Sequence, residues 1–377
     1  MKHLTTYITL FSTLLMANLC SSCSDNSIPG TDDNNAVQFS TYINGDWKEL
    51  SRASSYITEY DRPEFKSGDK ICVNGYYLPS GTTEIEGEPN FMNNQVMTFN
   101  GSDWVYSPIK YWPNNKRDKL AFWAYYPNVF SNMTASYNLE TGQPEIKFTD
   151  HPAYIDVLVA DMVTVDRTTD NGKVPLEFKH ILAKVYLVLC FKPYLPEGEP
   201  EPTLKVKYVQ YHKIPLSGTF TGFNEEGEPQ WKDIGYDNST GTTTNWYDPA
   251  TYELKPGEEV FIDQDYTLFM PFYIDELEII PLLVPAEGST ATISHRYSDD
   301  NGIGNYDEAN FEKDQGQNDD FNFYLSHRIG NEKGVYAAPG VETTIKITLG
   351  LYSIDNVDVS TRPYTKWNNA PNVNVYY

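Results

Sequence analysis

The chain has few basic residues for its length of 377. It holds 28 Lys and Arg against 52 Asp and Glu, which gives a formal net charge of −24. A surface of this sign repels the phosphate groups of nucleic acids, so we expect no nucleic acid among its partners.

Cysteine is also scarce. Of the four, Cys20 and Cys23 lie in an N-terminal export segment, which leaves Cys72 and Cys190 for the body of the chain. The sequence leaves open whether these two form a disulfide bond or remain free thiols buried in strands, the usual environment of free cysteine.

The short motifs that carry enzyme chemistry are missing. The sequence contains no Gly-x-Ser-x-Gly, no His-Glu-x-x-His and no P-loop. Its six histidines are not spaced as zinc ligands usually are, and acidic pairs such as Asp299 and Asp300 lack the spacing of an EF-hand loop. We therefore predict a protein that is not an enzyme and that needs no metal or other cofactor.

The sequence after residue 22 shows no helical period and no apolar run long enough for a membrane span. Apolar β-rich runs such as 120–126 and 185–191 stand between clusters of turn residues instead. This pattern predicts an all-β fold built from sandwiches. A polar, turn-rich stretch at 165–173 predicts a boundary between two domains, residues 36–172 and 173–377.

The N-terminus has the form of an export signal followed by an anchor. The apolar stretch at 7–19 suits a signal peptide and is too short for a membrane span. A small residue then precedes Cys23, as in a bacterial lipobox, although Cys20 stands where a lipobox normally has Leu. We expect a signal peptide at 1–22, acylation of Cys23 and a polar tether at 23–35. An ordinary cleaved signal peptide is the alternative.

Aromatic residues make up 14% of the chain, with 29 Tyr. A dense group occurs in the first half: Trp104, Tyr106, Tyr111, Trp112, Trp123, Tyr125 and Tyr126. Either these side chains form the core of a sandwich with tyrosines at its rim, or they form an exposed platform on which a sugar stacks.

Several segments follow one another in a distinctive order. After the lipobox come an alternating strand at 37–43 and then Ser51-Arg52-Ala53, Phe65–Ile71, Tyr106–Pro113, Leu120–Pro127, Leu176–Val185 and Thr343–Leu349. This order resembles the fimbrillin (Mfa-like) lipoproteins of Gram-negative gut and oral bacteria. The resemblance implies two tandem transthyretin-like Greek-key β-sandwich domains. It also implies a structural or adhesive subunit of a fimbria (pilus) at the cell surface, anchored by lipid in the outer membrane.

The same resemblance implies assembly by strand exchange. In polymerising members a trypsin-like protease cuts after an Arg that follows the first strand, which corresponds here to Arg52, with Ala53 as the new N-terminus. The first strand then leaves, and a strand from a neighbouring subunit replaces it. The displaced side chains would be Val37, Phe39, Thr41 and Ile43. Two C-terminal segments with the same two-residue period are candidate donors, with their apolar side chains at Val357, Val359, Val373 and Val375.

Alternatives remain open at each of these positions. Arg52 is otherwise an ordinary exposed loop residue, and the C-terminal segments otherwise pair within their own domain. The expected partners are other fimbrial subunits, the outer membrane, and a host receptor or glycan. The alternative function is a surface lipoprotein of the outer membrane that binds glycans without polymerising.

Overall fold

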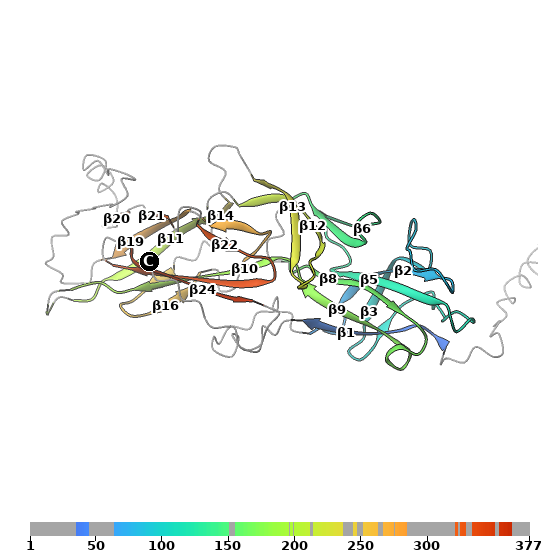
Figure 1. Ribbon diagram of the computed structural model, residues 1–377. Coiled ribbons are helices and arrows are strands. Elements are labelled where there is room, and N and C mark those ends of the chain that lie inside the picture. Colours follow the sequence, from blue (N-terminus) through green and yellow to red (C-terminus); the bar gives the residue numbers. More distant parts are fainter. Residues whose placement is uncertain are drawn as a thin grey trace, which may run out of the picture. The chain divides into compact units, whose positions relative to one another are not determined.

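The computed structural model is an all-β protein (Figure 1), as the sequence predicts. It describes residues 35–44, 64–150, 155–195, 197–198, 200–211, 214–236, 244–246, 252–262, 267–274, 276–284, 321–322, 325–328, 334–350 and 354–363. Within these ranges no helix has the length and apolar character needed to cross a bilayer. The 3₁₀ helix Thr169–Gly172 stands just before a long strand.

The first sheet has seven strands, and its neighbours are antiparallel except for the first pair, which is parallel. Its spatial order is β1 (Gln38–Asn44), β9 (Lys173–His180), β8 (Leu158–Val165), β5 (Lys119–Tyr126), β2 (Lys70–Leu78), β3 (Met92–Phe99) and β4 (Trp104–Val105). The register of β1 on β9 runs from Gln38 opposite Lys173 to Asn44 opposite Lys179. The chain therefore places its first strand at a sheet edge, next to a strand far away in sequence.

A second sheet packs against the first. Its strands are, in spatial order, β13 (Pro229–Tyr236), β12 (Pro215–Phe223), β7 (Gln143–Phe148) and β6 (Met133–Asn138). Tyr76 and Trp123 from the first sheet share one hydrophobic core with Ile146, Phe148 and Phe220 from the second. The continuous apolar run of β5 fits this position, because a central strand is buried on both faces.

The strand pairing does not follow the boundary expected at residue 172. Strand β9 and the hairpin of β12 and β13 come after that residue, yet they belong to the two sheets around the first core. A local hydrophobic period shows that a segment is a strand, but it does not show which distant strand it pairs with. The polar stretch at 165–173 is therefore a connection within one sandwich.

A second core lies among the remaining strands. One sheet has the order β16 (Glu259–Phe261), β10 (Ala183–Phe191), β23 (Val341–Leu349) and β24 (Ile354–Pro363), with β17 (Thr267–Phe269) also paired to β10. Another has β14 (Thr244–Trp246), β11 (Thr203–Tyr211), β19 (Glu276–Val284) and β20 (Phe321–Asn322), with β15 (Tyr252–Leu254) on β11 and β21 (Leu325–Arg328) on β19. Strands β18 (Phe272–Ile274) and β22 (Val335–Ala337) form a pair. The core includes Leu187, Leu204 and Ile345.

The two cysteines of the body are free and buried, Cys72 in β2 and Cys190 in β10. This finding decides between the two alternatives that the sequence left open. Burial raises the pKa of the Cys72 thiol, so the neutral thiol is favoured there.

Candidate functional site at the first strand

Strand β1 shows the two-residue period that its sequence predicts. Phe39 is 4% exposed, whereas Tyr42 on the opposite face is 54% exposed. Thr41 and Ile43 point to the same side as Phe39 by this period and are half-buried. The strand therefore has one face turned to the protein and one turned to solvent.

Residues 35–37, which lead into β1, belong to a separate compact unit together with residues 109–112. Within it, the backbone N–H of buried Val37 donates to Lys110 O at 2.9 Å, and Trp112 N–H donates to Asn35 O at 3.0 Å. Ala36 and Tyr111 form an isolated bridge between these hydrogen bonds. The chain before β1 is thus held by backbone pairing.

The ring of Phe39 packs edge-on against two other rings. Its centroid lies 5.3 Å from that of Phe122 and 6.0 Å from that of Tyr106. Burying a side chain of this size contributes about 2–3 kcal/mol, and edge-on aromatic pairs add about 0.5–1.5 kcal/mol each. Phe39 is therefore the main apolar attachment of β1 to the sandwich.

Gly75 in β2 makes room for the ring that receives Phe39. A Cβ built on Gly75 would lie 2.7 Å from Cε1 of Phe122, the residue directly opposite it on β5. We expect Gly75→Ala to lower the free energy of unfolding by about 1–3 kcal/mol, because Phe122 must leave its rotamer. Urea denaturation would measure this loss, with Val96→Ala at an exposed position of β3 as the control. A variant as stable as the wild type would show that the Phe122 ring moves freely.

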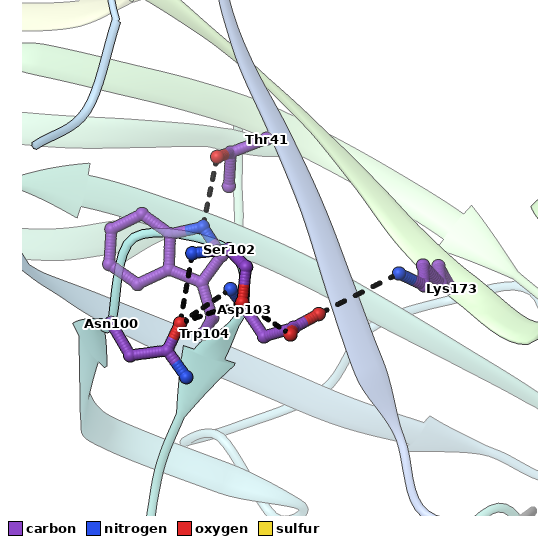
Figure 2. A network of polar contacts seen from close by, with 6 residues as sticks. All are labelled: Thr41, Asn100, Ser102, Asp103, Trp104 and Lys173. Carbon is purple, nitrogen blue, oxygen red and sulfur yellow. Dashed lines mark hydrogen bonds and ion pairs between the residues drawn. The ribbon is translucent and has the colours of Figure 1, made fainter. Parts of the chain in front are cut away.

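A side-chain contact joins the two ends of the seven-stranded sheet. Although β4 is at the opposite end of the strand order from β1, the indole N–H of Trp104 on β4 donates to Thr41 Oγ1 at 2.9 Å. Figure 2 shows the indole nitrogen directed at the threonine hydroxyl. The sheet therefore curls until its edge strands meet, and β1 contacts β4 as well as β9.

Rings around Trp104 hold its indole in place. Trp104 is 7% exposed, and its ring centroid lies 5.1 Å from that of Phe65 and 5.2 Å from that of Phe99. Phe65 in turn packs edge-on against Phe178 of β9 at 5.1 Å. Aromatic packing thus continues from β4 to the strand that pairs with β1.

The turn before Trp104 is built by one asparagine. The side-chain oxygen of Asn100 accepts hydrogen bonds from the backbone N–H groups of Ser102 at 2.9 Å and Asp103 at 2.8 Å. Gly101 has a φ of 105°, in the left-handed region that favours glycine. Asp103 also lies 3.9 Å from the ammonium group of Lys173 on β9. This ion pair is exposed and contributes less than about 1 kcal/mol.

The outer face of β1 carries one further polar contact. Burial, together with a hydrogen bond to the Glu177 carboxylate, raises the pKa of Tyr42 to about 12. Glu177 is the register partner of Tyr42 on β9. The phenol therefore stays neutral and donates to the carboxylate throughout the physiological range.

Strand β9, which would become an edge without β1, has a buried polar contact at its end. Nδ1 of His180 lies 2.6 Å from Oδ2 of Asp156, and these side chains are 1% and 2% exposed. Asp156 comes just before β8, the other neighbour of β9. The contact therefore ties β9 to β8 inside the sandwich.

The candidate donor residues are only partly described. Val357 and Val359 lie in β24, where they are buried and pair with Ile347 and Ile345 of β23. They thus pair within their own domain, which is the alternative noted from the sequence, and their role as donors stays a prediction. The remaining predicted site residues lie outside the described ranges: Cys23, Arg52, Ala53, Val373 and Val375.

The aromatic group of the first half forms core rather than a platform. Four of its members are buried, namely Trp104, Trp112, Trp123 and Tyr125. Tyr111 is 40% exposed, and Tyr106 and Tyr126 are half-buried. Over the described ranges, moreover, no three His, Cys, Asp or Glu side chains are placed to hold a metal ion.

Sequence reasoning placed the strand but not its polar contacts. Trp104 was expected to be core or platform, and nothing near it in the sequence points to Thr41, 63 positions earlier. Likewise, nothing in the sequence indicates that Asp103 and Lys173 lie close together, because their contact depends on the curl of the sheet.

Comparison with known proteins finds one matching family model. A family model described as fimbrillin-like matches residues 52–313, which is more than half of the chain. A fimbrial protein from Bacteroides vulgatus has 15% identity and a TM-score of 0.52, over 88% of this chain and 100% of that one. A proposed cell adhesion protein from Bacteroides ovatus has 12% identity and a TM-score of 0.43, over 89% and 99% of the two chains. The first likeness shows a shared fold. The curated proteins include no match to the chain.

Proposed function

The chain belongs to the fimbrillin-like family, and on this basis we propose that it is a structural and adhesive subunit of a cell-surface fimbria. In this proposal the chain is exported as a lipoprotein, acylated at Cys23 and anchored in the outer membrane. Two or more acyl chains at one residue are enough for stable attachment to a membrane. A host receptor or a glycan is a further partner of the assembled fimbria.

Subunits join by strand exchange after cleavage behind Arg52. The observation that supports this step is the position of β1. It is an edge strand with one neighbouring strand in its sheet, and Arg52 lies between β1 and β2 in the sequence. A cut there separates β1 from the rest of the chain, and Ala53 becomes the new N-terminus.

Loss of β1 leaves a binding site for another strand. The edge of β9 then presents the unpaired backbone groups that β1 used, and such an edge is a template for an added strand. The rings of Tyr106 and Phe122 lose their contact with the ring of Phe39, and an apolar side chain of the incoming strand can take its place. The replacement comes from a neighbouring subunit, at the segment with Val357 and Val359 or at the one with Val373 and Val375.

Processing at Arg52 is tested by substituting it. We expect wild-type protein from cell-surface fibres to begin at Ala53 and to give a ladder of oligomers in mild detergent. Arg52→Ala should remove both features, because a trypsin-like protease then has no basic residue to recognise. Intact mass spectrometry of fibre and membrane fractions is the measurement.

Arg117→Ala is a matched control, because Arg117 is an exposed loop arginine of the first sandwich. It should leave the N-terminus at Ala53 and the ladder unchanged, with the mass lowered only by the substitution itself. Wild-type protein that still begins at acylated Cys23 in the ladder would contradict processing at Arg52. Wild-type protein without any ladder would instead favour the glycan-binding alternative.

A further inference from the structure

We propose that Trp104 selects the strand that replaces β1, by requiring a hydrogen-bond acceptor close to the backbone, such as the hydroxyl of Thr or Ser, at the position now held by Thr41. The preferred occupant is residues 357–361 of a second copy of this chain. This inference rests on the proposed strand exchange and adds to it a rule for which strand is accepted and in which register.

The rule follows from the chemistry of the indole. Its N–H is a donor without any acceptor function, so only an oxygen or nitrogen acceptor on the incoming strand can satisfy it. The Trp104 ring is almost fully buried among Phe65 and Phe99, and the Asn100 turn fixes the backbone before it. The indole therefore cannot turn to water, and an apolar side chain opposite it would leave a buried donor without an acceptor.

The contact also fixes the register of the incoming strand. A shift by one residue turns every side chain to the opposite face, so the apolar period already forbids it. A shift by two residues keeps the period and would be tolerated by apolar packing alone. It would, however, move the hydroxyl away from Trp104 and bring an apolar side chain to the indole N–H. The contact with Trp104 therefore disfavours a shift by two residues, which the apolar period alone would allow.

The two candidate donors differ at this position. The sequence here has Val37 directly before β1, and then Phe39 and Thr41 within it, that is, two apolar residues followed by a hydroxyl at every second position. The segment at 357–361 repeats this order with Val357, Val359 and Thr361, which are residues of β24.

The other segment, 373–377, has Val373, Val375 and Tyr377. A phenol oxygen stands a full ring further from the backbone than the hydroxyl of Thr, so it does not reach the same point. The rule thus favours residues 357–361.

Strand β24 is also placed so that it can be donated. It is the last strand of its sheet, with β23 as its neighbour. Thr361 lies opposite Thr343 and is half-buried. An edge strand can leave by breaking one ladder, whereas a central strand must break two.

The test measures binding of a labelled peptide of residues 354–363 to the processed chain that begins at Ala53, by fluorescence anisotropy. We expect T361V in the peptide to weaken binding about tenfold, because it removes the acceptor while keeping the shape. S360A, which changes the neighbouring hydroxyl on the opposite face, should bind like the wild-type peptide. On a chain with Trp104→Phe, the wild-type and T361V peptides should bind equally.

The possible results separate this inference from the proposed function. Equal binding of the wild-type and T361V peptides to the wild-type chain would overturn selection by Trp104 and leave strand exchange intact. If the peptide does not bind while processed chains still form ladders, residues 357–361 are not the occupant. If there is neither binding nor a ladder, strand exchange itself fails. The peptide variants do not affect folding of the chain, so the comparison stands even if Trp104→Phe folds poorly.

Discussion

Phe39→Ala is expected to release the first strand about a thousandfold more often than in the wild type. Truncating a buried aromatic side chain costs about 3–5 kcal/mol, and Phe39 is 4% exposed between two rings. A loss of about 4 kcal/mol corresponds to roughly a thousandfold change in an equilibrium constant. Because β1 is an edge strand, this loss falls on local opening rather than on global unfolding. Hydrogen exchange of the β1 amides, followed by mass spectrometry, measures the opening.

The control is Tyr42→Ala on the solvent face of the same strand. Tyr42 is 54% exposed, so its truncation should accelerate exchange of β1 by less than about tenfold. Exchange in β5 should stay slow in both variants. If Phe39→Ala accelerated hydrogen exchange in β5 as much as in β1, the first strand would not open independently. Replacement of β1 by another strand without unfolding of the sandwich would then be ruled out.

Asp156→Ala is expected to lower the free energy of unfolding of the first sandwich by about 3 kcal/mol. The substitution removes the carboxylate that lies 2.6 Å from the buried Nδ1 of His180. Breaking a buried polar pair by removing one partner costs about 3–5 kcal/mol, because the other partner has lost its water and then loses its contact. Urea denaturation monitored by tryptophan fluorescence gives the change, since Trp123 lies in the same sandwich.

An exposed pair in the same sheet supplies the comparison. Asp103→Asn removes the charge that faces Lys173 at 3.9 Å, and both side chains are solvent-exposed. We expect a loss below about 1 kcal/mol. If the Asp156→Ala variant lost no more than this, the contact at the end of β9 would not be what secures that strand.

Much of the fold could be predicted from local patterns. The alternation of Phe39 and Tyr42 marks a strand with one buried face, and the structure confirms it. The continuous apolar runs at 120–126 and 185–191 mark central strands, which are β5 and β10. These predictions succeed because each depends only on which side chains along a short segment are buried and which are exposed to solvent.

The long-range pairings could not be predicted in this way. Nothing around Pro215–Phe223 shows that this strand joins Gln143–Phe148, so the expected domain boundary differs from the pairing observed. The contact of Trp104 with Thr41 depends on the curl of a whole sheet. The candidate donor residues show the same difficulty. The two-residue period of Val357 and Val359 is compatible with pairing in their own sheet, which the structure shows, and equally with pairing to another subunit.

The parallel pairing of β1 with β9 has a consequence for the newly made chain. The first residue of β1, Gln38, is synthesised long before its partner Lys173. At ribosomal rates of about 5–20 residues per second, the interval is on the order of ten seconds. The first strand of the sandwich therefore has no edge of β9 to pair with while the intervening residues are being made. Because both strands belong to one chain, β1 then binds this edge as an intramolecular ligand, at a high effective concentration, for as long as the chain between them is intact.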